Sequence, residues 1–126
     1  MTNNNSQTRR LQLQPRLHDG VYVYCCATQE YAIPTSAVCV VCEPEGNTLI
    51  LPEQEAQRLE LKPGFRAAWI TLDTQTNLTD VGITAVISQA LAEQGISCNM
   101  VAGYYHDHLF VPAERGEEAI RLIAGL

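Results

Sequence analysis

The segment that decides the fold is FRAAWITLD, residues 65–73, and the rest of the chain is interpreted outward from it. Its side chains alternate with the two-residue period of a strand, so that Phe65, Ala67 and Trp69 share one face. The pattern breaks at Asp73, where polar turn formers take over. The sequence therefore predicts a strand that ends in a loop at Asp73.

A helix is predicted after this loop. Thr79 or Asp80 is placed to accept hydrogen bonds from the free amides of its first turn. Gly95 supplies the left-handed residue that commonly ends a helix, and Ile96 follows as the hydrophobic contact of that cap. An apolar stripe at helical spacing forms the inward face. The stripe consists of Ile83, Val86, Ile87, Ala90 and Leu91.

Two more strands and a last helix follow. Residues 97–102 and 109–111 are predicted strands, and residues 103–107 form the hairpin turn between them. A run of strand, helix, strand, strand is half of the ferredoxin-like arrangement. Pro112 then opens a helix in which Glu117 can pair with Arg121. Its inward stripe consists of Gly116, Ala119, Ile120 and Ile123.

The N-terminal half repeats this pattern incompletely. Strands are predicted at residues 21–27, 37–43 and 48–51. Residues 44–47 are a hairpin turn, and residues 53–61 form a short helix in which Pro52 suits the first position. Residues 9–17 fit either a strand or a short helix that stops at Pro15.

No residues remain after the last helix for the fourth strand that a ferredoxin-like unit requires. That strand must come from the N-terminal half or from another chain. We expect an α+β, ferredoxin-like (βαββαβ) fold of two interleaved modules with antiparallel sheets and helices on one face of each sheet. The expected division is a disordered tail at residues 1–8, an N-terminal module at 9–62 and a C-terminal module at 63–126.

Composition excludes several classes of partner. The 126 residues carry a net charge of −6 with a pI near 4.9, and the eight Lys and Arg residues are scattered. Nucleic acid and anionic membrane surfaces both need clustered basic residues, so neither is an expected partner. No apolar run approaches the roughly 20 residues of a membrane span. The polar N-terminus has no apolar signal core, which favours a cytoplasmic location.

Catalytic and metal chemistry are not favoured either. Cys39 and Cys42 have the spacing of a metal or redox pair, but they lie in a predicted strand, where residues three apart face opposite ways. The five cysteines are best explained as reduced core residues. His106 and His108 share a face of a strand and His18 could join them, but a polar hairpin with exposed rings is the simpler reading. We find no nucleophile elbow and no phosphate-binding glycine loop, and expect neither enzyme activity, nor a cofactor, nor a metal.

Residues 78–87 and 91–97 resemble an ACT domain, the small-molecule sensing module of aspartokinases and other amino-acid-pathway enzymes. The hairpin 104–111 is similar to one ACT subgroup of short stand-alone bacterial proteins: it keeps Tyr104 and Asp107 and departs at Tyr105, His106 and His108. Residues 20–24 and 43–46 resemble the module that precedes the ACT segment in those proteins. The resemblance implies an effector site where the loop after the first strand meets the helix, at an interface between two modules.

Chemistry supports the same location. Backbone amides at Val81, Gly82 and Ile83 suit the carboxylate of an amino acid, and Asp80 suits its ammonium group. Asn77 or Asn99 could add polar contacts. The predicted ligand-binding residues are Asn77, Leu78, Thr79, Asp80, Val81, Gly82, Ile83 and Asn99.

Simpler roles exist for the same residues. Asp80 would serve equally as a helix cap, and Gly82 as a close packing contact of helix on sheet. Asn77 is a typical turn residue, and Asn99 fits the solvent side of an edge strand. We therefore carry two hypotheses. The first is a regulatory homodimer that binds a free amino acid or a similar small zwitterion, and the second is an assembly module without a small-molecule ligand.

Overall fold

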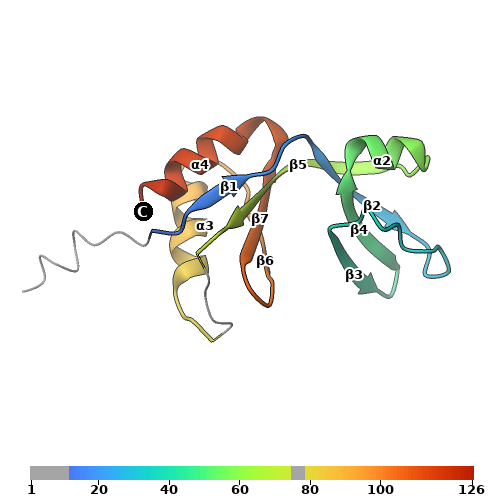
Figure 1. Cartoon of the computed structure of the whole chain (residues 1–126), viewed down its shortest axis with the longest axis horizontal. Helices are drawn as coiled ribbons and strands as arrows, with labels where there is room; N and C mark the ends of the chain where they lie inside the picture. The colour runs from blue at the N-terminus through green and yellow to red at the C-terminus, as the bar shows by residue number, and fades with distance from the viewer. Residues whose placement is uncertain (1–11, 75–78) are drawn as a thin grey trace, which may run out of the picture.

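The computed structural model describes residues 12–74 and 79–126. The chain forms two lobes, and both the long strand β5 and the segment between β1 and β2 pass from one lobe to the other (Figure 1). The strands are β1 (Pro15–Leu17), β2 (Tyr22–Ala27), β3 (Cys39–Glu43), β4 (Gly46–Pro52), β5 (Pro63–Leu72), β6 (Asn99–Ala102) and β7 (Asp107–Pro112). The helices are α2 (Glu53–Arg58), α3 (Ile83–Glu93) and α4 (Gly116–Ala124), the last preceded by the 3₁₀ turn η1 (Ala113–Arg115).

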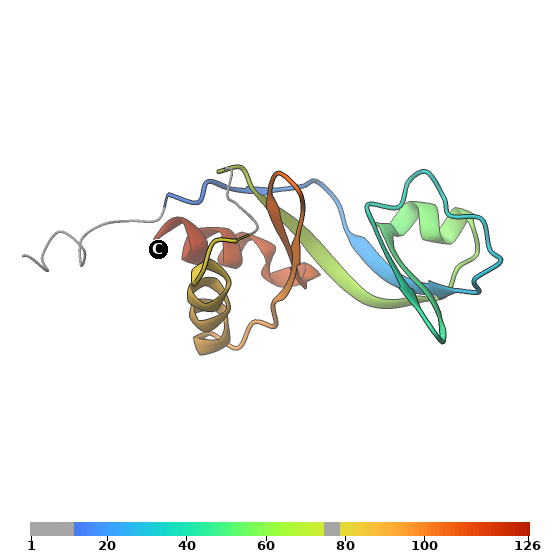
Figure 2. The ribbon, with the colours of Figure 1, turned by 90° about the horizontal axis from the view of Figure 1, so that it is seen from below.

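The long strand β5 belongs to both lobes. Its first half pairs with β2, from Cys25 opposite Pro63 to Tyr22 opposite Ala67, and its second half pairs with β7 and β1. The described strands form one antiparallel sheet in the order β3-β4-β2-β5-β7-β6, with β1 beside β5. Figure 2 shows β5 passing diagonally from one lobe to the other.

Each lobe is a ferredoxin-like unit that borrows a strand. In the C-terminal lobe, β5, β6 and β7 are completed by β1, which lies beside β5 on the side away from β7. In the N-terminal lobe, β2, β3 and β4 are completed by β5 in the equivalent place. The missing strand therefore comes from the N-terminal half of the same chain, and the ambiguous segment before residue 18 is a strand at Pro15–Leu17. The interleaved α+β fold is confirmed.

The helices of the C-terminal lobe cover one face of its sheet. Ala68, Ile70 and Leu72 of β5 point toward the helices α3 and α4. They meet Ile87 and Leu91 from α3 and Ala119 and Ile123 from α4, all of them buried. Each fully buried aliphatic side chain contributes about 1.5–3 kcal/mol relative to exposure, so this face holds the lobe together. The N-terminal lobe has a smaller core under α2, built from Val23, Cys25, Ala27, Leu49, Leu51 and Ala56.

The opposite face of the sheet is aromatic. Because β5 alternates, Trp69 and Phe65 lie on the face away from α3 and α4, together with Phe110 of β7 and Tyr22 and Tyr24 of β2. Phe110 is buried there and packs edge-on against the ring of Tyr24, with centroids 5.9 Å apart. The sheet is therefore packed on both faces where the lobes meet.

The ends of the predicted helices differ in detail from the sequence analysis. The prediction of the helix start was wrong: α3 begins at Ile83, and the residue in the N-cap position is Gly82 rather than Thr79 or Asp80. Gly95 is left-handed (φ 72°) and Ile96 is buried, as predicted for the helix end. Val86 is 41% exposed and so lies outside the core stripe. Pro52 is the N-cap of α2, one position before its predicted place.

The helix α4 differs from the sequence prediction in one ion pair. Gly116, Ala119 and Ile123 are buried as predicted, and Ile120 is partly buried against the same core. The ion pair at the start of this helix joins Arg115 to Glu118, with Nε and Oε1 2.7 Å apart, rather than Glu117 to Arg121.

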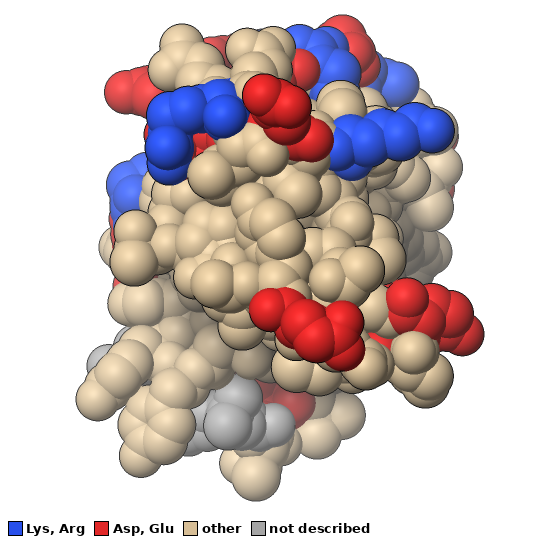
Figure 3. Space-filling view, turned by 90° about the vertical axis from the view of Figure 1, so that its right-hand side faces the viewer, with Lys and Arg blue, Asp and Glu red and all other residues tan. Residues whose placement is uncertain are grey.

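Charged groups lie in mixed patches. At the end of the N-terminal lobe, Lys and Arg gather on the edge that carries α2 and lie beside acidic groups (Figure 3). Two ion pairs in this region join Arg58 to Glu55 and Arg66 to Glu53, each with N and O 2.8 Å apart. No field of positive charge forms on this face. Among the described residues, none of the helices is long and apolar enough to cross a membrane.

Candidate functional site

A pocket of about 270 Å³ opens at the start of α3. One wall is the segment from Asp80 to Thr84, which leads into the helix, and the other is the β6–β7 hairpin through Ala102 and Asp107. Ala102 and Asp107 are direct partners across the hairpin, so its register sets both beside the helix start. The pocket thus joins a helix N-terminus to two carboxylates.

The residue in the N-cap position of α3 makes no side-chain cap. Gly82 has φ 98°, a left-handed conformation that favours glycine, and it has no side chain with which to cap the helix. The first turn of α3 carries no acidic residue, and the amide of Val86 donates to the Gly82 carbonyl at 3.0 Å. The amides before Val86 and the positive end of the helix dipole therefore form a place for an anion.

The structure places four of the eight predicted site residues at this pocket. Asp80, Val81, Gly82 and Ile83 line the pocket, and Thr79 is exposed just before them. Asn77 and Leu78 lie outside the described residues.

Asn99 lies at the far end of β6 from this pocket. It is opposite Phe110 in the hairpin, and its side-chain amide donates to the Phe110 carbonyl at 3.4 Å. The pocket instead gains Thr84, Ala102 and Asp107, which the sequence analysis did not select. The hairpin was predicted, but its turn was placed at residues 103–107; in the structure β7 already begins at Asp107, and this shorter turn pairs residue 102 with residue 107.

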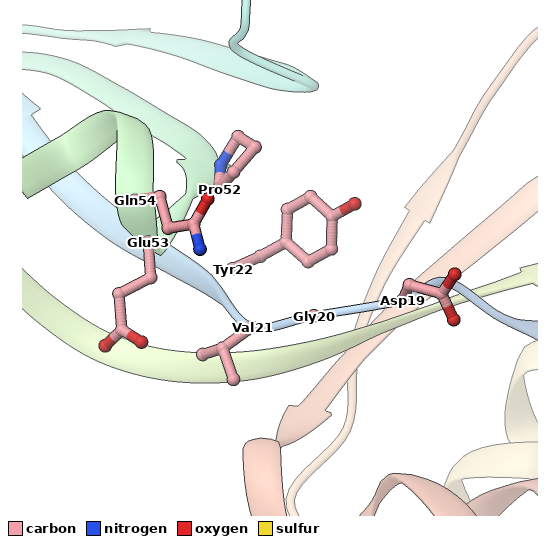
Figure 4. Close-up of a pocket in the computed structure, with 7 residues that line it drawn as sticks. All are labelled: Asp19, Gly20, Val21, Tyr22, Pro52, Glu53 and Gln54. Atoms are coloured by element: carbon pink, nitrogen blue, oxygen red, sulfur yellow. The ribbon is translucent and has the colours of Figure 1, made fainter. Parts of the chain in front are cut away.

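A larger cavity of about 410 Å³ lies between the lobes, where the connection from β1 to β2 passes the start of α2. Its polar groups do not converge: the carboxylates of Asp19 and Glu53 point in different directions, and Tyr22 lies between them (Figure 4). Glu53 is paired with Arg66, which holds the pKa of its carboxyl below the usual value. We therefore do not place the principal site here.

Two histidines, His18 and His108, contact the same threonine hydroxyl on the aromatic face. His18 Nε2 lies 2.7 Å from the hydroxyl of Thr71, and the same hydroxyl lies 2.9 Å from Nδ1 of His108. Burial lowers the pKa of both imidazoles, which favours their neutral forms. His106 lies before β7, and its carbonyl accepts a hydrogen bond from the Gly103 amide at 2.8 Å.

This arrangement does not resemble a metal centre. Over residues 12–74 and 79–126, no group of three or more His, Cys, Asp or Glu residues is arranged to hold a metal ion. Cys39 and Cys42 both lie in β3, opposite Ile50 and Asn47, and both are free thiols. The strand between them leaves no turn that could bring the two sulfurs to one ion.

The fold defines the class of the protein as a tandem of small ferredoxin-like α+β modules that share a strand. Family models described as ACT domain match residues 11–68 and residues 65–124, which together span nearly the whole chain. The chain belongs to the ACT-domain family, as a tandem of two such domains.

Solved structures agree with this assignment. A Vibrio cholerae protein of unknown function, described as a possible transport protein, is 37% identical; the match covers 90% of this chain and 89% of that one, with a TM-score of 0.79. The ligand-free regulatory subunit of aspartate kinase from Thermus thermophilus is 13% identical and shares the fold (88% and 94% covered, TM-score 0.64). The same subunit from Thermus flavus is equally similar (13% identical, 89% and 95% covered, TM-score 0.64). No curated protein sequence matches.

Proposed function

We propose that this protein is a non-catalytic regulatory module that binds a free amino acid, or a similar small zwitterion, at the start of α3. The observation that carries the proposal is the pocket between the Asp80–Thr84 segment and the β6–β7 hairpin. It combines amide donors at a helix start with two carboxylates, and a zwitterion needs both kinds of partner.

The two ends of such a ligand are recognised by different groups. Its carboxylate would accept hydrogen bonds from the first amides of α3, where Gly82 lets it approach the backbone closely. Its ammonium group would lie toward Asp80 and Asp107, the two acidic side chains of the pocket. The side chain of the ligand would then point past Val81 toward solvent or a second molecule.

The surface around the pocket supports a homodimer as the working form. Val81 is 94% exposed, and Tyr104 and Tyr105 of the hairpin turn are 79% and 61% exposed. The rings of Tyr104 and Tyr105 contact each other, with centroids 4.9 Å apart, and an exposed aromatic patch of this kind can mark a contact surface. The same observation favours the second candidate function, an assembly module in which these side chains pair two chains and no small molecule takes part. The cytoplasmic location remains a prediction from the sequence.

Thermal denaturation in the presence of each free amino acid tests the proposal. A ligand at a hundred times its dissociation constant should stabilise the fold by about 2.7 kcal/mol. Asp80→Asn should remove that gain, and Glu45→Gln, an exposed change in the β3–β4 turn, should keep it. Light scattering with and without the ligand then reports on assembly. A stable dimer that no amino acid stabilises would favour the assembly module instead.

A further inference from the structure

His108 lies where the β6–β7 hairpin leaves the shared strand β5. Within the described residues, Thr71–His108 is the last pair in the ladder between β5 and β7, on the side next to the hairpin turn. The His108 ring contacts the side chains of Trp69 and Thr71 through Nδ1. Its Nε2 lies against Gly103 in the turn, where a Cβ would be only 3.3 Å away. The ring therefore connects the turn to β5 at the point where this ladder ends.

The contacts at Nδ1 of His108 determine where the protons lie. The indole N–H of Trp69 can only donate, and its Nε1 lies 3.2 Å from this Nδ1, so Nδ1 carries no proton. The Thr71 hydroxyl, 2.9 Å from the same nitrogen, must donate to it as well, because otherwise two lone pairs would face each other. Since its single proton points to His108, the hydroxyl can only accept from His18, whose Nε2 lies 2.7 Å away. The hydrogen bonds thus run in one direction, from His18 through Thr71 to His108.

This chain of hydrogen bonds tolerates a second proton on His18 but not on His108. His18 would take it up on Nδ1, which is not part of the chain, and the cation would still lie on the ring of Trp69, a favourable contact. His108 would take it up on its own Nδ1, where it would face the indole N–H. The indole would then lose its acceptor, and the hydroxyl of Thr71, a residue only 2% exposed, would have to turn its proton away from both imidazoles. Buried donors without acceptors are unfavourable.

The titratable and charged groups around His108 act in both directions. They are His106 and Asp107 on the same hairpin, Arg16 and His18 at β1, and Cys39 of the N-terminal lobe. Burial is the main cause that lowers the pKa of His108; His106 and Arg16 add to the lowering, and Asp107 opposes it. Burial raises the pKa of the Cys39 thiol, which favours its neutral form. Of these groups, Asp107 is the one that favours a charged imidazole.

We propose that His108 is a proton-controlled latch: uptake of a proton at Nδ1 breaks its contacts with Trp69 and Thr71 and releases the end of the β6–β7 hairpin from β5. Ala102 and Asp107, which are paired across this hairpin, line the pocket at α3, so the release moves one wall of that pocket. The aliphatic core under α3 and α4 lies on the other face of the sheet and stays packed. The latch does not depend on what the pocket binds.

The wild-type protein, without any ligand, carries the test. The chain contains one tryptophan, so a single indole N–H resonance reports on the latch. In an NMR titration from pH 8 to pH 5, this resonance should move upfield as the N–H loses its acceptor, with the same midpoint as the His108 ring. The amide resonances of Ala102 and Asp107 should shift with that midpoint, and the amide resonance of Ile123 in α4 should not.

Two results on the wild type would overturn the proposal. One is an indole N–H resonance that stays in place while His108 takes up its proton. The other is a His108 that takes up a proton only when the whole chain unfolds, because a local release would then not exist. Neither result bears on amino-acid binding at α3, which is measured separately.

Two variants assign the latch to one imidazole. His108→Gln keeps an acceptor for the indole N–H but does not titrate, so its indole resonance should hold one position over the same pH range. His18→Gln is the matched control and should retain the wild-type transition. Loss of the transition in His18→Gln, with His108 still titrating, would assign the switch to His18 and contradict the proposal. Where a variant does not fold, the wild-type titration decides.

Discussion

The imidazole of His18 lies flat on the indole of Trp69, with ring centroids 3.5 Å apart and planes 4° from parallel. The backbone repeats the contact, because the His18 amide donates to the Trp69 carbonyl at 2.9 Å. His18 directly follows β1, the strand that completes the sheet of the C-terminal lobe. The stack therefore stabilises the pairing of β1 with β5 at the position where the chain passes from the C-terminal to the N-terminal lobe. Thr71 extends the contact to His108 on β7.

The histidine pair predicts a pH dependence of stability. Burial lowers the pKa of His18 and His108 in the folded state below the ordinary value of 6.5, which the unfolded chain keeps. Below pH 6.5 the unfolded state therefore binds more protons, and the free energy of unfolding falls as the pH drops through the folded pKa values. Arg16 adds to the lowering at both imidazoles, whereas Asp73 and Asp19 oppose it at His18, as Asp107 does at His108.

Urea denaturation between pH 5 and 8 measures this effect. The wild type should be most stable above pH 6.5, and a variant with both His18→Gln and His108→Gln should show a flatter profile. The paired carboxylates of Asp73 and Glu53 lose their contribution only below their ordinary values of 3.8 and 4.5, a lower window. Equal slopes for the variant and the wild type between pH 5 and 6.5 would contradict the assignment.

The segment before β1 should be essential for the C-terminal lobe. Leu13 is 3% exposed and packs into the core under α3 and α4, so Leu13→Ala should lower the free energy of unfolding by about 2–5 kcal/mol. Chemical denaturation measures the loss. Arg16→Gln is the matched control, because Arg16 pairs with Asp73 at an exposed site and its loss should matter far less. Wild-type stability of Leu13→Ala would show that the N-terminal segment is not part of this core.

Local patterns in the sequence were enough to predict the elements of the C-terminal lobe. The alternation in residues 65–73 and the stripe from Ile83 to Leu91 each report on the surroundings of one element, and both elements are present, although α3 begins later than its predicted cap. The sharing of β5 could not be predicted in the same way. Which strand pairs with each half of β5 depends on residues that are distant in sequence, such as Tyr22 and Pro112 opposite the same Ala67.

The sequence indicated only part of the pocket at α3. The segment from Asp80 to Ile83 was selected because it lies near a predicted helix start, although the cap residue of that helix was predicted wrongly. Asn99 was chosen for its polarity, but it lies three residues along β6 from Ala102, and only the hairpin register decides which end of the strand faces the pocket. The link from His18 through Thr71 to His108 joins three strands or their ends, and no spacing in the sequence encodes it.

Gly116 should not tolerate a side chain. A Cβ at this position would lie 2.9 Å from the Cβ of Ala68 and 3.2 Å from Cδ1 of Leu17, so the helix α4 sits directly on β5 and β1. Gly116→Ala should lower the free energy of unfolding by about 1–3 kcal/mol, although alanine is normally the better helix former.

The matched control is Gly125→Ala at the other end of α4. There a Cβ meets only backbone oxygens at 3.6 and 3.7 Å, an ordinary contact distance. Denaturation curves of the two variants should therefore differ in midpoint, with Gly125→Ala close to the wild type. Equal midpoints would mean that α4 lies farther from the sheet than the structure shows.

The last prediction separates backbone strain from ligand binding at Gly82. Gly82 (φ 98°) and Gly20 (φ 84°) are both left-handed, and a Cβ at either would meet nothing within 4 Å. Alanine at each position should therefore cost about 1–2 kcal/mol through the backbone alone. Only Gly82 lies at the start of α3, so Gly82→Ala should also weaken amino-acid binding, measured by calorimetry, and Gly20→Ala should not.

Gly82→Asn should recover part of the stability that Gly82→Ala loses, because asparagine tolerates this conformation better than alanine. Equal affinity in Gly82→Ala and Gly20→Ala would exclude the backbone of Gly82 from the binding site.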